Sequence, residues 1–315
     1  MNVAEASTAL VWGAATAYAI ALVCFTMLLA RQADRVAVRE TVAVGAGAKA
    51  EPSTAASEPL AAPRSKVEGI ARATVWAGLA LHLGAAVTRG IAAGRAPWAN
   101  LYEFMLVGSL VAVVVLLLVQ REKIIPFLGT AVVGIVVLFL AVAQVNFFVP
   151  ADGVQPALQS YWLVIHVGVA VISTGVFTVG FVAAILQLLR SSRAEGSPRL
   201  ASKGWGWLES TPAPAALESL SFRLNAVGFV LWTFTLIAGA IWAEHAWGRY
   251  WGWDPKEVWT FVIWVVYAGY LHARTTRGWA GRRSAWLVTV AYACVVANFT
   301  LVNMLFPGLH SYANV

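Results

Sequence analysis

The sequence predicts an all-α, polytopic integral membrane protein with about eight transmembrane helices and both termini outside. Of its 315 residues, 60% are hydrophobic and 12% are charged, which is more apolar than ordinary globular domains. A water-soluble protein cannot bury that much apolar surface, whereas lipid accepts it on the outside of every helix. The length alone would allow two soluble domains, and the composition excludes them.

Eight apolar runs are long enough to cross about 30 Å of hydrocarbon, which takes about 20 helical residues. They cover approximately residues 8–30, 69–88, 101–119, 125–147, 160–189, 220–243, 257–275 and 284–305. Eight crossings return the chain to its starting side, so both termini are expected on one side of the membrane. No soluble domain is left over, and residues 1–315 are predicted to form a single membrane domain.

The distribution of basic residues predicts the orientation of the chain. When successive connections are assigned to alternate sides, one side receives all but four of the 22 Lys and Arg residues. The four exceptions are Arg89, Arg95, Arg249 and Lys256. Because cytoplasmic connections carry the excess of basic residues, we expect the connections 31–68, 120–124, 190–219 and 276–283 inside. The formal charge of +7 therefore indicates topology rather than nucleic-acid binding.

Two of the inner connections have distinctive compositions. Residues 40–66 are rich in Ala, Gly, Ser, Pro and Glu and contain almost no large apolar side chain, so they cannot bury enough surface to fold alone. We predict a flexible cytoplasmic linker there. Residues 190–217 are predicted to form a cytoplasmic loop, in which Trp205, Trp207 and Leu208 rest at the membrane interface, where tryptophan is enriched.

Several chemistries are excluded because their motifs are missing. The two cysteines, Cys24 and Cys294, lie within predicted spans, and the sequence has no C-x-x-C or C-x-x-C-H segment. The chain is therefore neither a dithiol oxidoreductase nor itself a c-type cytochrome. No Walker-type or G-x-G-x-x-G pattern supports nucleotide binding.

The outer connection at residues 242–259 is the most distinctive segment, with five tryptophans in 18 residues. An interfacial aromatic belt would account for some of them, but a belt is spread over all helix ends. Here the tryptophans gather in one short loop, and Gly248 and Gly252 allow close backbone approach. The segment therefore favours a platform for a flat aromatic ligand.

Part of this loop also has a purely structural explanation. Asp254 can cap the following helix, Pro255 suits its first position, and Glu257 completes a capping-box arrangement. Asn100 and Glu103 repeat the same spacing at the outer start of the third span. Helix capping is therefore the favoured role of both pairs.

Two of the five histidines are predicted to approach the tryptophan loop. His166 lies about two turns below the outer end of the fifth span, and His310 follows the eighth span on the outer side. Two neutral imidazoles across an aromatic-walled cleft are what axial ligation of haem iron requires. His272 is placed too near the inner end of the seventh span to join them. The alternative remains that each membrane histidine hydrogen-bonds between helices.

These segments together resemble a known family. Residues 247–259, WGRYWGWDPKEVW, resemble the WWD signature of haem-handling proteins, and the chain is similar to the CcsA/ResC family of cytochrome c biogenesis System II. Residues 94–103 (GRAPWANLYE), 270–274 (YLHAR) and 303–312 also resemble stretches of that family. The length and the number of predicted spans agree with it.

The resemblance implies that haem b is bound non-covalently as a substrate. The implied contacts are His166 and His310 for the iron of an external site, His272 for the iron of an inner site, and Trp247, Trp251, Trp253 and Asp254 for the external platform. In the family, a ResB/CcsB-type membrane subunit supplies the other ligand of the inner site. The resemblance gives no ligand role to His245 or to His82, and helix packing or a polar lining is the favoured interpretation of His82.

The resemblance also implies a mechanism. Haem would pass from the cytoplasmic to the external side and be presented at the WWD loop, where its vinyl groups meet the cysteine thiols of a C-x-x-C-H segment in apocytochrome c. The chain would then be the haem-transporting component of a holocytochrome c synthase (haem lyase) complex. The protein contributes mainly positioning and exclusion of water, and Arg249 is a candidate partner for a haem propionate.

Three other functions remain open from the sequence. The chain could deliver haem to a chaperone as CcmC-like proteins do, transport a substrate other than haem, or only scaffold its partner. A composition rich in alanine, with Arg in excess of Lys, favours a multi-pass protein of a bacterial plasma membrane over one of a thylakoid membrane.

Overall fold

The computed structural model describes residues 2–45, 65–121, 124–151 and 160–310. No strand occurs among these residues. The helices are α1 Val3–Gly45, α2 Lys66–Ala93, α3 Leu101–Val119, α4 Pro126–Asn146, η2 Leu163–Val167, α5 Gly168–Ala194, η3 Pro198–Leu200, η4 Lys203–Ser210, α6 Pro214–Trp247, α7 Pro255–Thr276, α8 Arg282–Ala297, η5 Asn298–Val302 and α9 Asn303–Leu305. The predicted all-α class is confirmed.

Within the described residues, seven helical stretches are long and apolar enough to cross a membrane. They are Val3–Asp34, Lys66–Ala93, Leu101–Val119, Pro126–Asn146, Leu163–Ala194, Pro214–Trp247 and Arg282–Leu305. The remaining predicted span, 257–275, coincides with α7, which has 22 residues and so a length of about 33 Å. Charged residues near both ends of α7, together with its Trp and Tyr side chains, lower its hydropathy. The multi-span membrane class is therefore confirmed, with one helix fewer than predicted meeting both requirements.

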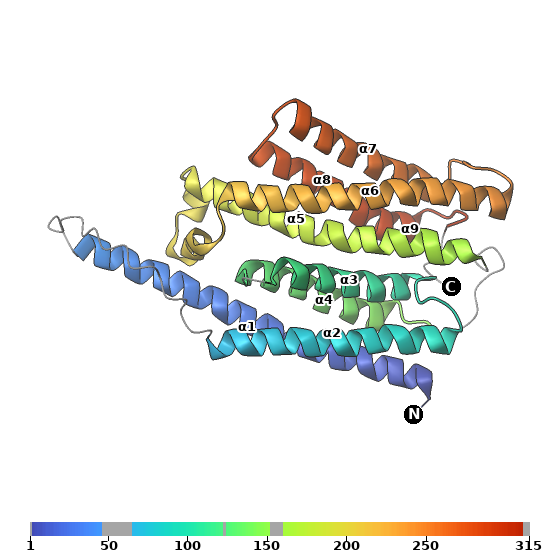
Figure 1. Ribbon diagram of the computed structural model, residues 1–315, viewed down its shortest axis with the longest axis horizontal. Coiled ribbons are helices and arrows are strands. Elements are labelled where there is room, and N and C mark those ends of the chain that lie inside the picture. Colours follow the sequence, from blue (N-terminus) through green and yellow to red (C-terminus); the bar gives the residue numbers. More distant parts are fainter. Residues whose placement is uncertain (1, 46–64, 122–123, 152–159, 311–315) are drawn as a thin grey trace.

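The long helices lie side by side, and the α6–α7 connection lies at the same end of the bundle as the start of α1 (Figure 1). One hydrophobic core joins α1 to α4 and contains Tyr18 and Leu106. A second core joins α5 to α8 and contains Tyr267. Helix α5 belongs to both, because Val179 packs in the first core and Phe177 in the second. It is the central helix of the bundle.

Helices α5 and α6 are held together by hydroxyl groups and by a glycine. Ser173 Oγ donates to the carbonyl oxygen of Gly228 at 2.8 Å, and Ser221 Oγ donates to that of Gly180 at 2.9 Å. A Cβ atom on Gly228 would lie 2.5 Å from the Phe177 ring. Hydroxyls and small residues are the usual means by which membrane helices pack closely, and here they fix the pair of helices that carries one side of the site.

The two predicted inner connections differ in how much of them is described. Helix α1 extends to Gly45, and most of the predicted linker 40–66 lies outside the described residues. The predicted loop 190–217 contains η3 and η4, and Trp207 and Leu208 are buried rather than exposed at an interface. Trp207 stacks on Phe127 of α4 with ring centroids 5.0 Å apart. Burial against the bundle gives Trp207 and Leu208 more apolar packing contacts than an interfacial position would.

Candidate functional site

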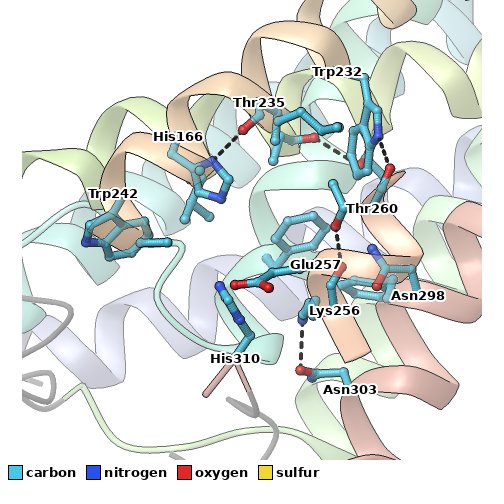
Figure 2. Close-up of a pocket in the computed structure, with 18 of the residues that line it drawn as sticks. His166, Trp232, Thr235, Trp242, Lys256, Glu257, Thr260, Asn298, Asn303 and His310 are labelled. Atoms are coloured by element: carbon cyan, nitrogen blue, oxygen red, sulfur yellow. Dashed lines mark hydrogen bonds between the residues drawn. The ribbon is translucent and has the colours of Figure 1, made fainter. Parts of the chain in front are cut away.

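A large cavity lies at the end of the bundle where α6 is connected to α7 (Figure 2). Its walls come from α3, η2, α5, α6, α7, α8, η5, α9 and the connections before α3 and between α6 and α7. They include Trp98, Trp232, Trp242, Tyr250 and Trp251. The space not filled by atoms, including the mouth, is about 1180 Å³. Aromatic side chains therefore line a space that is open at its mouth.

The cavity brings His166 and His310 together from distant parts of the chain. Among the described residues, no group of three or more His, Cys, Asp or Glu side chains could hold a metal ion. Imidazole is a common metal ligand, and both imidazoles line this one cavity. Both project into the space in Figure 2.

His166 is presented by an irregular turn of helix. It lies in the π-helix η2, which leads directly into α5, and π-turns inside helices are frequent at functional sites. Its Nδ1 lies 2.9 Å from the carbonyl oxygen of Thr235, and the Trp242 ring meets the imidazole edge-on at 5.6 Å. A proton on Nδ1 is donated to that carbonyl, and the lone pair is then on Nε2.

Gly239 of α6 makes this position of His166 possible. A Cβ atom at residue 239 would lie 2.6 Å from Cε1 of His166, which is closer than nonbonded carbon atoms approach. The imidazole is therefore held between the Thr235 carbonyl, the bare backbone of Gly239 and the Trp242 ring.

His310 is positioned by Asp254. The His310 Nδ1 lies 3.1 Å from Asp254 Oδ1, while Asp254 Oδ2 accepts a hydrogen bond from the Leu309 N–H at 2.7 Å. Trp247 packs against the imidazole in a T-shaped contact with centroids 4.8 Å apart. A histidine that donates from Nδ1 to a carboxylate carries its lone pair on Nε2, which is the usual arrangement behind metal-binding histidines.

The electrostatics of Asp254 favour its ionised form. Burial by itself raises the pKa of this carboxyl, but the hydrogen bond and charge of His310, with the N–H groups of Lys256 and Leu309, lower the pKa to about 2. Asp254 is thus an acceptor for the His310 imidazole throughout the neutral range.

The predicted capping box of α7 is confirmed. Asp254 is the N-cap and accepts from the Lys256 N–H, and the Glu257 side chain accepts from the Asp254 N–H. Asp254 therefore has two structural tasks, because the same carboxylate begins α7 and holds His310.

At the start of α3, the predicted capping box is only half formed. Asn100 caps the helix by accepting from the Glu103 N–H at 2.9 Å. Glu103, however, does not return a bond to the Asn100 backbone. Its carboxylate accepts from the Ala99 N–H at 2.9 Å and pairs with Arg89 and Arg95, because two guanidinium groups, one of them buried, attract it more strongly than one amide.

The three tryptophans of the predicted platform occupy different places. Trp247 contacts His310, and Trp251 lines the cavity. Trp253 is 76% exposed, touches Trp251 edge-on at 5.9 Å, and has a φ of 59°. A non-glycine residue with positive φ is uncommon outside strained or functional loops. Trp253 does not line the cavity in this structure.

The other three histidines lie outside the cavity lining. His272 is exposed near the end of α7 distant from the cavity, and His245 is exposed at the end of α6. His82 is fully buried, with its ring nitrogens 3.3 Å from Tyr18 Oη and 2.8 Å from the Leu106 carbonyl oxygen. The expected packing role of His82 agrees with these contacts.

Several lining residues were not identified from the sequence. They are Trp98, Trp232, Lys256, Asn298 and Asn303. Polar side chains inside an apolar span often indicate function. Asn298 and Asn303, near the end of the last span, could have been singled out on that ground. The π-helix η5, which contains Asn298, is visible only in three dimensions.

These elements define a multi-span membrane protein with an aromatic-lined cavity at one end of its helical bundle. Residues 98–310 match the family model described as cytochrome c assembly protein. The chain belongs to the CcsA family of cytochrome c assembly proteins, and cytochrome c biogenesis is its function.

Curated relatives cover most of the chain. The cytochrome c biogenesis protein CcsA of a Prochlorococcus marinus strain is 35% identical over 249 residues, which are 72% of this chain and 78% of the relative. CcsA of Synechococcus sp. (strain RCC307) is 36% identical over 269 residues, which are 79% and 86% of the two chains. The family implies that the protein handles haem.

A solved structure shares the fold. The cytochrome c haem lyase CcmF superposes with a TM-score of 0.65 at 17% identity, over 96% of this chain and 47% of CcmF. The chain therefore spans about half the length of CcmF, and at this identity the similarity concerns the fold alone.

Proposed function

We propose that the chain binds haem b as a non-covalent substrate in the cavity, with His166 and His310 as the two axial ligands, and presents it for attachment to apocytochrome c. The observation that supports this most directly is the pairing of the two imidazoles in one aromatic-lined cavity. Each Nδ1 faces an oxygen acceptor, the arrangement that orients Nε2 toward a metal.

Attachment requires each cysteine S–H of a C-x-x-C-H segment to add across a haem vinyl group. One C–S bond forms and the thiol proton passes to the neighbouring vinyl carbon, so the addition needs no net oxidant or reductant. The residues of this chain hold the macrocycle, orient it and exclude water, which is how a protein assists a reaction that belongs to its substrate. Trp247 and Trp251 support the platform, and Trp253, exposed beside Trp251, is placed to meet the incoming apocytochrome.

The inner haem site is the second part of the proposal. His272 is exposed on α7, near the helix end distant from the cavity, and an ionisable side chain on a membrane-spanning helix is a candidate functional residue. A ResB/CcsB-type membrane subunit would cover this face and supply the second iron ligand. Haem would then pass from this site to the cavity on the external side of a bacterial plasma membrane. The cyanobacterial relatives make a thylakoid membrane the alternative location.

The first test is the visible absorption spectrum of the wild-type protein, purified in mild detergent after co-expression with a ResB/CcsB-type partner. We expect a Soret band and, on reduction, sharp α and β bands of low-spin haem with two nitrogen ligands. A colourless protein at good yield, with haem supplied, would contradict the haem site. That result would favour a transporter of another substrate or a scaffold.

Gly239 provides a conservative test of how His166 is placed. Gly239→Ala puts a methyl group where only 2.6 Å separate it from the His166 ring, so the imidazole must move. We expect haem affinity to fall by about tenfold or more, as when an outer-shell partner of a metal ligand is lost. Spectrophotometric haem titration measures this.

The matched control is Gly269→Ala on α7, where a Cβ atom meets nothing within 4 Å. It should leave haem affinity unchanged, since alanine in an open helical position is tolerated. Equal affinities for the two variants would show that the close approach of α6 does not position His166.

A further inference from the structure

The cavity contains a single Lys or Arg side chain among the described residues that line it, Lys256. Its Nζ donates a hydrogen bond to Asn303 Oδ1 at 2.8 Å, and that acceptor is a neutral amide. The ion pairs formed by the described residues do not include Lys256. Charges held in apolar surroundings are normally paired with an opposite charge, so this ammonium group is suited to an anion supplied from within the cavity.

The two neighbouring carboxylates bond mainly to backbone N–H groups, although Glu257 Oε1 is buried without a hydrogen-bond partner. Glu257 Oε2 accepts from the N–H groups of Gly252 and Asp254 at 2.8 and 3.1 Å. Asp254 Oδ1 faces His310 and the Lys256 backbone N–H, and its Oδ2 accepts from Leu309. Among the described residues, neither acid forms a hydrogen bond or an ion pair with the Lys256 ammonium group, whose direct partner is the Asn303 amide.

Polar groups are gathered on one side of the cavity. Figure 2 shows Lys256, Asn298 and Asn303 together on the side formed by α7, η5 and α9, with His310 next to Lys256 and Trp242 on the far side. Asn298 Oδ1 is buried without a hydrogen-bond partner. This side of the cavity is therefore polar, with the Lys256 ammonium group and two amides beside the Glu257 carboxylate, and Trp242 lies opposite it.

We propose that Lys256, held by Asn303, binds a propionate carboxylate of the haem and so fixes which edge of the macrocycle faces α7. This inference rests on the proposed haem site. The two propionates of haem b occupy one half of the ring and the two vinyl groups the other half. Anchoring the propionate edge at Lys256 therefore directs the reactive vinyl edge away from α7, toward the side that carries Trp242.

The other candidate cation, Arg249, is less suited to this task. It does not belong to the cavity lining, its side chain is 36% exposed, and it lies 3.7 Å from Glu257 Oε1. A Cβ atom on Gly252 would collide with its guanidinium group, which shows that the Arg249 side chain lies over the loop backbone. We therefore assign the propionate to Lys256 rather than to Arg249, the candidate that the sequence suggested.

The test compares two porphyrins, haem b and iron protoporphyrin IX dimethyl ester, whose propionates carry no charge. Each is titrated into the detergent-solubilised full chain and followed at the Soret band. We expect the wild type to bind haem b about tenfold or more tightly than the ester, as a charge-assisted hydrogen bond would give. Lys256→Met should abolish this preference, Lys256→Arg should retain part of it, and Arg249→Gln should retain it fully.

The comparison of the two porphyrins on the wild-type protein tests the role of Lys256 even if Lys256→Met does not fold. Equal binding of both porphyrins by the wild type would overturn the role of Lys256 and leave the bis-histidine site intact. A preference that persists in a folded Lys256→Met variant would also overturn it. If neither porphyrin shows a saturable shift of its Soret band on titration, the haem site itself fails, and this inference fails with it.

Discussion

Alanine at either His166 or His310 is expected to abolish the low-spin bis-histidine spectrum and to lower haem affinity more than about 100-fold. Loss of an outer-shell partner alone typically costs about 10–100-fold, and these substitutions remove the ligand itself. Added imidazole should restore the low-spin bands, because it can occupy the space that the deleted ring leaves beside the Thr235 carbonyl or the Asp254 carboxylate. The measurements are the reduced visible spectrum with and without imidazole, and the yield of mature c-type cytochrome in cells.

His245→Ala is the matched control for this pair. His245 is exposed at the end of α6 and does not line the cavity, so its removal should change neither the spectrum nor the cytochrome yield. A normal low-spin spectrum in His166→Ala or His310→Ala would rule out bis-histidine ligation in this cavity. Loss of colour in all three variants would indicate a general folding defect instead.

Local and compositional features of this chain were predictable from its sequence. Apolar runs of span length located the eight long helices, since each crossing needs about 20 apolar residues. They did not predict that α1, with 43 residues, continues well past its expected end at residue 30. The cap of α7 was also predictable, because an Asp-Pro-x-Glu start satisfies backbone groups only a few positions away. Such features depend on residues that are close in sequence.

Contacts between distant residues were not predictable in this way. The His310 to Asp254 contact joins positions 56 apart, and the His166 to Thr235 contact joins positions 69 apart. No periodicity or cap encodes which carbonyl or carboxylate faces a given imidazole. The convergence of the two histidines was anticipated from topology, whereas the groups that orient them, and the cation of the cavity lining, required the packed structure.

Glu103 shows how a local rule can miss a stronger long-range interaction. Its spacing from Asn100 indicated a reciprocal cap, but its side chain is fully buried between two arginines. Arg89 Nε lies 2.9 Å from Glu103 Oε1, and Arg95 Nη1 lies 2.6 Å from Oε2. The Arg89 guanidinium also donates to the Pro150 carbonyl oxygen at 3.1 Å. This cluster ties α2 and the α2–α3 connection to the start of α3, next to the Asn100 and Leu101 wall of the cavity.

Glu103→Ala should therefore destabilise the fold by about 3–5 kcal/mol, because deleting one member of a buried ion pair leaves its partner charge uncompensated. Thermal unfolding in detergent, without added haem, measures this separately from ligand binding.

Glu209→Ala is the matched control. Glu209 pairs with Arg193 at 2.9 Å but is 40% exposed, so its loss should cost at most about 1 kcal/mol. Glu103→Gln should fall between the two, since an amide oxygen can still accept from Ala99 but cannot balance two guanidinium charges. Similar unfolding temperatures for Glu103→Ala and Glu209→Ala would show that the buried cluster contributes no more to stability than a surface pair.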